Sequence, residues 1–110
     1  LVDQRVLKAM GEVPRERFVP RNLRRRSYDD GPLPIAEGQT ISQPFIVAAM
    51  TESAQVAPSD RALEIGTGSG YGAAVLSRVA AGVVSVERHG LLAKSAADLL
   101  ASLGYDNVTW

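Results

Sequence analysis

The sequence predicts an α/β fold with a parallel sheet, and three observations lead to this fold class. Apolar, strand-like runs alternate with helix-like segments over 61–110, which is typical of parallel sheets whose strands are joined by helices. The first run is followed by glycines at alternating positions, Gly66, Gly68 and Gly70. The second run, 82–86, ends in Glu87, about 17 residues beyond the last glycine. Together, this order of strand, glycine loop, helix, strand and acid is typical of nucleotide-binding folds.

The first part of the chain, 1–57, is predicted to form a helical layer beside this sheet. Apolar residues recur at helical spacing near the start, which predicts a short amphipathic helix over 2–10 that ends at Gly11. The segment 13–34 contains four of the six prolines, so we expect irregular structure there.

A second helix is predicted over 42–56, and it begins beside a serine that has two candidate roles. Ser42 fits the N-cap position, which serine often fills, and Pro44 then lies in the first turn. On spacing alone, helix capping is the simpler interpretation of Ser42. A role at an active site is compatible with capping, so both interpretations stay open at this point.

The second part, 58–110, is predicted to be the first half of an α/β domain. After a turn at Pro58 come, in order, strand 61–65, helix 71–80, strand 82–87, helix 90–103 closed by Gly104, and the opening of a third strand at 107–110. We expect Tyr71, just past the glycines, to pack its helix onto the sheet.

Three strands form only one half of a doubly wound sheet, which binds its ligand beside the first strand. The first strand, 61–65, would then lack a neighbour on one side and would leave an apolar edge exposed. We therefore expect the chain to be the N-terminal half of a longer catalytic domain. The first residue, Leu1, agrees with this expectation because it is not an initiator methionine.

Composition excludes several classes of function. Twelve basic and twelve acidic residues balance, and no apolar run approaches the roughly 18 residues that span a bilayer. We expect a cytoplasmic protein with no membrane or nucleic-acid partner.

Six arginines form a basic cluster that we interpret as a solvated face: Arg15, Arg17, Arg21, Arg24, Arg25 and Arg26. Without cysteine, thiolate catalysis and cysteine zinc sites are excluded, and 28–30 (Tyr-Asp-Asp) is predicted to be a turn rather than a metal site.

The glycine spacing favours S-adenosylmethionine over a dinucleotide. The loop reads G-x-G-x-G, and Tyr71 stands where a dinucleotide fingerprint has its third glycine. Glu64, two residues before the first glycine, suits an ammonium group better than a pyrophosphate, and Glu87 can accept hydrogen bonds from a ribose. Two simpler interpretations stay open: the glycines form only a tight turn, and Glu64 is a solvated carboxylate.

Three segments resemble the bacterial type of protein-L-isoaspartate (D-aspartate) O-methyltransferases. They are VPRERFVP at 13–20, LPIAEGQTISQPFIVAAMTE at 33–52 and LEIGTGSGY at 63–71. The glycine loop is shared by many methyltransferases, whereas GQTISQP is much more specific to this family. Ala36 and Gly72 depart from the residues that are usual there, glycine and glutamine.

The resemblance implies a class I S-adenosylmethionine-dependent methyltransferase fold, Rossmann-like, with an added N-terminal helical layer. It also implies that the glycines hold the methionine end of the cofactor, that Glu87 holds its ribose, and that Ser42 is the active-site serine. The cofactor-binding residues expected on this basis are Thr40, Ile41, Ser42, Glu64, Gly66, Thr67, Gly68, Ser69, Gly70, Glu87 and Arg88.

The implied reaction is methyl transfer to the free carboxylate of L-isoaspartyl residues in damaged proteins or peptides. Two alternatives stay open: a related enzyme acting on aspartate in a modified natural-product peptide, and a cofactor-fold fragment without turnover. We expect the 110-residue chain to be inactive alone and the full-length protein to be monomeric. The single histidine, His89, gives no basis for a Ser–His–Asp triad.

Overall fold

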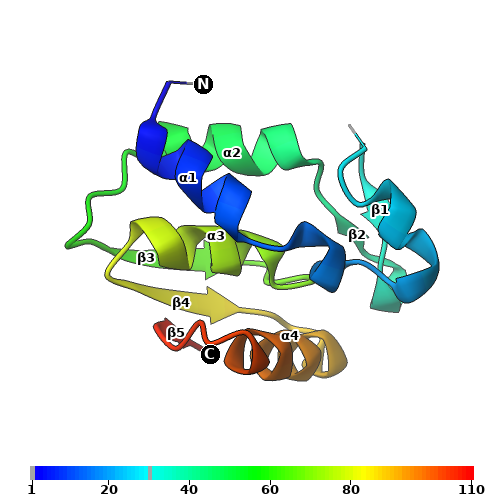
Figure 1. The fold of residues 1–110 in the computed structure, drawn as a ribbon. Coiled ribbons are helices and arrows are strands. Elements are labelled where there is room, and N and C mark those ends of the chain that lie inside the picture. The colour runs from blue at the N-terminus through cyan, green and yellow to red at the C-terminus, as the bar shows by residue number, and fades with distance from the viewer. Residues whose placement is uncertain (1, 30) are drawn as a thin grey trace.

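The computed structural model describes residues 2–29 and 31–110, and Figure 1 shows its helices and strands. The α-helices are α1 (Gln4–Glu12), α2 (Pro44–Ser53), α3 (Tyr71–Val79) and α4 (Gly90–Ser102). The strands are β1 (Leu33–Pro34), β2 (Thr40–Ile41), β3 (Arg61–Ile65), β4 (Gly82–Val86) and β5 (Val108–Thr109). Short 3-10 helices span Arg15–Phe18, Arg21–Arg26 and Ala36–Gly38.

Helix α1 begins later and ends later than the sequence predicts. Asp3 is its N-cap, because the Asp3 side chain accepts hydrogen bonds from the backbone N–H groups of Arg5 and Val6. Gly11 lies inside the helix rather than at its end. The interval 13–34, predicted to be irregular, contains two of the 3-10 helices and strand β1.

Helix α2 begins at Pro44, and the predicted cap at Ser42 is wrong. Gln43 occupies the N-cap position and makes no side-chain capping bond, while Pro44 stands at the start of the helix as predicted. Proline needs no hydrogen-bond partner at that position, so the helix can begin without a serine cap. The side chain of Ser42 is consequently not used in helix capping.

The predicted parallel sheet is confirmed, with strand order β3–β4–β5. Each pair is parallel, and Glu64 on β3 stands opposite Ser85 on β4. β3 lies at an edge of this sheet, and its side chains Leu63 and Ile65 are 65% and 74% exposed. The predicted exposure of apolar groups on the first strand is thus observed.

Gly104 terminates α4, as the sequence predicts. Gly104 has φ +83°, and its N–H donates to the carbonyl of Ala101, while the N–H of Tyr105 donates to the carbonyl of Leu100. This pair of bonds is a Schellman motif, in which a glycine adopts the left-handed conformation just beyond the helix.

One hydrophobic core joins the helical layer to the sheet domain. Val6 and Ala9 of α1 are buried in the same cluster as Val75 and Val79 of α3, and α1 lies across α3 in Figure 1. The Arg5 side chain crosses the same contact and donates hydrogen bonds to the carbonyls of Val56 and Val79. The division into 1–57 and 58–110 stays a prediction about the sequence.

Tyr71 belongs to this core, although not in the expected way. Its ring meets Phe18 edge-on at 5.7 Å between centroids, and the Arg15 guanidinium lies 4.8 Å from the Tyr71 centroid. Tyr71 therefore packs α3 against the N-terminal layer, where the sequence had suggested packing against the sheet.

Candidate functional site

The glycine loop between β3 and α3 adopts a conformation that few other residues tolerate. Gly66, Gly68 and Gly70 have φ of +90°, +55° and +94°, values at which a side chain is strained. A Cβ at Gly70 would also stand 3.0 Å from side-chain atoms of Ala96 and Leu100 on α4. Gly70 thus permits close helix packing, whereas Gly66 has open space where a Cβ would be.

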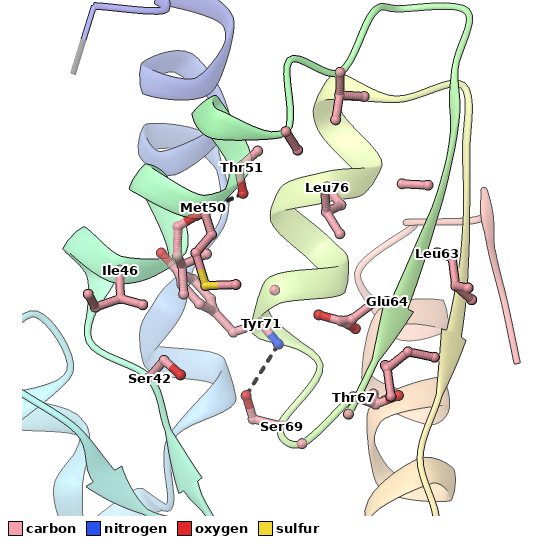
Figure 2. Close-up of a pocket in the computed structure, with 18 of the residues that line it drawn as sticks. Ser42, Ile46, Met50, Thr51, Leu63, Glu64, Thr67, Ser69, Tyr71 and Leu76 are labelled. Carbon is pink, nitrogen blue, oxygen red and sulfur yellow. Dashed lines mark hydrogen bonds between the residues drawn. The ribbon is translucent and has the colours of Figure 1, made fainter.

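Glu64 extends from β3 toward α3, as Figure 2 shows. Its Oε1 accepts a 2.6 Å hydrogen bond from Ser85 Oγ. A Cβ at position 72 would lie only 2.5 Å from Glu64 Oε2, so Gly72 leaves the room that this carboxylate fills. Burial is the main cause that raises the pKa of Glu64 to about 6; the Ser85 bond lowers it, and the charge of Glu87 raises it.

Glu87 lies at the carboxyl end of β4, beside the glycine loop. One oxygen accepts from the backbone N–H of His89 at 3.0 Å, and the other accepts from the N–H of Gly68 at 2.9 Å. These backbone bonds lower the pKa of Glu87 below its ordinary value. Glu87 is therefore ionised at neutral pH, and the neighbouring Arg88 is exposed.

A cleft of about 640 Å³ opens between the glycine loop, β3 and α2. Its polar lining includes Ser42, Glu64 and Ser69, and its apolar lining includes Ile46 and Met50 of α2 (Figure 2). Of the site residues predicted from the sequence, the cleft brings together Thr40, Ile41, Ser42, Glu64, Gly66, Thr67, Gly68 and Ser69. The other predicted residues, Gly70, Glu87 and Arg88, do not line it.

Ser42 is exposed at the cleft, and its backbone carbonyl is held by a hydrogen bond from a buried arginine. Its carbonyl accepts a 2.9 Å hydrogen bond from Arg15 Nη2. Arg15 is fully buried and also donates from Nε to the carbonyl of Ser27. The prediction that all six arginines form a solvated face is thus wrong for Arg15, while the other five are exposed.

Sequence reasoning missed three contributors to the site: Arg15, Ser85 and the apolar side chains of α2. The sequence holds a signal for α2, because Ile46 and Met50 are apolar residues at helical spacing within the predicted helix 42–56. Both side chains are exposed and line the cleft. Ser85 sits in an apolar strand, where a lone serine between valines is the only signal.

No metal site accompanies this cleft within residues 2–29 and 31–110, because no three His, Cys, Asp or Glu side chains gather there. Asp30, part of the predicted turn, lies outside that range. Among the helices of the same described residues, none is long and apolar enough to cross a membrane.

A family model described as protein-L-isoaspartate(D-aspartate) O-methyltransferase matches residues 1–110. The chain belongs to this family. Among its relatives, a protein-L-isoaspartate O-methyltransferase from Roseiflexus castenholzii is 62% identical over 107 residues, covering 97% of this chain and 49% of the relative. One from Protochlamydia amoebophila is 59% identical over 107 residues and covers 97% and 51%. The chain spans about half the length of the curated protein-L-isoaspartate O-methyltransferases it matches.

Solved structures agree with the family's fold. One protein-L-isoaspartate O-methyltransferase has a TM-score of 0.84 at 36% identity, with 98% of this chain and 37% of that chain covered. A Plasmodium falciparum structure has a TM-score of 0.82 at 24% identity, with 99% and 55% covered. The expected fold, the N-terminal part of an α/β Rossmann-like methyltransferase, is confirmed.

Proposed function

We propose that the chain is the N-terminal half of an S-adenosylmethionine-dependent methyltransferase that acts on L-isoaspartyl residues in damaged proteins and peptides. The cleft carries this proposal, because it brings the segment around Ser42 and the glycine loop to one space. Family membership supports the reaction class. The Plasmodium falciparum structure, solved in complex with S-adenosyl-L-homocysteine, supports the cofactor.

The residues around the loop fit the chemical groups of this cofactor. Gly66 and Gly68 turn the backbone at the cleft with no side chain in the way. Glu64 offers a carboxylate to an ammonium group. Each oxygen of Glu87 accepts one backbone hydrogen bond, and a carboxylate has about four lone-pair sites, so both can also accept from ribose hydroxyls.

When bound, the cofactor supplies an electrophilic methyl group on a positively charged sulfur. A carboxylate acceptor is already ionised at neutral pH, so the chain needs no general base. Methyl transfer forms an oxygen–carbon bond as the sulfur–carbon bond breaks and its electron pair returns to sulfur. Ser42 can donate a hydrogen bond that orients the acceptor, while Ile46 and Met50 line the cleft with apolar surface that would keep water from a bound acceptor.

The decisive experiment offers isotopically labelled S-adenosylmethionine to the full-length protein with matched peptides. We expect methyl transfer to an isoaspartyl peptide and none to the aspartyl peptide of the same sequence. Equal labelling of the two peptides would reject the proposed specificity. Labelling of neither would reject the activity itself.

The 110-residue chain alone is expected to bind S-adenosylmethionine weakly or not at all and to be inactive. The adenine and acceptor sides of the site then depend on the remaining half of the enzyme. Calorimetry on this chain measures the point directly, and tight binding would contradict it. The cytoplasmic location and the monomeric state of the full-length protein stay predictions.

A further inference from the structure

Ser85 is a buried polar residue that contacts two groups of the proposed cofactor site. It lies on β4, directly opposite Glu64 on β3, and is fully buried. Its Oγ is 2.6 Å from Glu64 Oε1 and 2.6 Å from Oγ1 of Thr67 in the glycine loop. One hydroxyl therefore joins the strand-end carboxylate to the loop.

The direction of these hydrogen bonds follows from chemistry. An ionised carboxylate can only accept hydrogen bonds, so the Ser85 hydroxyl uses its single hydrogen to donate a hydrogen bond to Glu64. Ser85 Oγ must then accept a hydrogen bond from the Thr67 hydroxyl. The resulting chain of hydrogen bonds runs from Thr67 through Ser85 to Glu64 and uses the Ser85 hydroxyl both as donor and as acceptor.

The second carboxylate oxygen of Glu64, Oε2, fits against α3 because Gly72 has no side chain there. Glu64 Oε2 lies 2.5 Å from where a Cβ on Gly72 would stand. The carboxylate is thus held by Ser85 at one oxygen and fits against the bare surface of α3 at the other. Both features fix its direction within the cleft.

We propose that Ser85 is a positioning residue for cofactor recognition, which orients Glu64 toward the ammonium group of S-adenosylmethionine and couples it to Thr67 in the loop. The inference rests on the proposed function. It adds a residue that touches no part of the cofactor and acts through Glu64.

A pH profile separates positioning from a purely structural role. Burial raises the pKa of Glu64 to about 6, and the Ser85 bond opposes that rise while the charge of Glu87 adds to it. The other titratable side chains that line the cleft are Asp60, Arg61 and Tyr71. Without the Ser85 hydroxyl, the pKa of Glu64 rises further, so affinity for an ammonium group begins to fall at a higher pH.

The test measures S-adenosylmethionine binding by calorimetry between pH 5 and 7 on the full-length protein. For the wild type we expect affinity about tenfold lower at pH 5 than at pH 7, because Glu64 is then mostly protonated. Ser85→Ala should weaken binding at pH 7 by about 3- to 10-fold, the range of one hydrogen bond, and move the midpoint of the pH profile upward. Ser85→Thr keeps the hydroxyl and should restore the wild-type midpoint.

A matched control is Ser77→Ala, because Ser77 is also buried, and within the described residues its hydroxyl bonds only the carbonyl of Ala74 and Nε of Arg78, both on α3. It should leave affinity and midpoint unchanged. If Ser85→Ala does not fold, Ser85→Cys replaces it, since a thiol of similar size is a weak donor and should shift the midpoint in the same direction.

Two results would overturn the inference alone: wild-type affinity in Ser85→Ala, or weaker binding of Ser85→Ala with an unmoved midpoint. The failure of the proposed function looks different. In that case the wild type itself binds no S-adenosylmethionine at any pH, and the inference falls with it.

Discussion

Arg15 donates a hydrogen bond to the carbonyl of Ser42 across 27 residues of sequence, at 2.9 Å. The guanidinium is fully buried, rests on the Tyr71 ring and also bonds the Ser27 carbonyl. Burying a cation is costly; here Nε and Nη2 reach the two carbonyls and the Tyr71 ring lies against the guanidinium, while the buried Nη1 has no hydrogen-bond partner among the described residues. Arg15 therefore ties the backbone of the cleft to the core.

Replacing Arg15 should destabilise the protein strongly. Arg15→Met leaves the carbonyls of Ser27 and Ser42 without these partners, and an unpaired buried group such as the Ser27 carbonyl costs about 1–3 kcal/mol. Urea unfolding of the full-length protein measures the free energy of unfolding. The control is Arg17→Met, because Arg17 is exposed and should stay within about 0.5 kcal/mol of wild type. Equal losses in the two variants would contradict the assignment.

Ser42→Ala should lower activity without lowering stability. Because Ser42 caps no helix, the cost of about 1 kcal/mol typical of a lost cap should be absent. We expect a lower kcat for isoaspartyl peptide, and a loss in kcat that exceeds any loss of affinity for S-adenosylmethionine. A drop in the free energy of unfolding of the size of a lost cap would show that the capping interpretation was right.

Stability should depend on pH through Glu64. Its pKa in the folded state, about 6, exceeds the ordinary value of 4.5, so the folded state binds more protons between these two values. The contribution of Glu64 to the free energy of unfolding is largest below pH 4.5. It is lost as the pH rises through 6, and the loss amounts to up to about 2 kcal/mol. Glu64→Gln should flatten this part of the profile in urea unfolding at pH 4.5 and 6.5. An equal slope in wild type and variant would contradict the raised pKa.

Glu87→Ala should weaken S-adenosylmethionine binding by roughly 1.5–3 kcal/mol, the scale of charge-assisted hydrogen bonds. Two interactions are lost in this variant: the proposed hydrogen bonds from the ribose hydroxyls to Glu87, and the hydrogen bond from the N–H of Gly68 to Glu87. Asp98→Ala serves as the control because Asp98 is exposed and, among the described residues, forms an ion pair only with the exposed Lys94. An unchanged dissociation constant in the Glu87 variant would place the ribose elsewhere.

The glycine loop and Glu87 could be predicted because their signal is local. A strand, three glycines and an acid at fixed spacing specify one loop geometry wherever the rest of the chain lies. The parallel order β3–β4–β5 follows in the same way from alternating strands and helices.

The residues that the sequence could not place depend on distant partners. Arg15 resembles its five neighbours in the basic cluster, and its burial comes with contacts to Ser27, Ser42 and Tyr71, 12 or more residues away in the sequence. Ser85 has an ordinary place in a strand until β3 brings Glu64 opposite it, 21 residues away in sequence. Long-range packing decides both positions, and no local pattern records it.

The contact of α1 with α3 has a consequence for synthesis on the ribosome. The buried face of α1, with Val6 and Ala9, packs against Val75 and Val79, which are translated some seventy residues later. At about 5–20 residues per second, the nascent helix waits roughly 4 to 15 s for its partner. Throughout that interval its apolar face is open to chaperones and to other nascent chains.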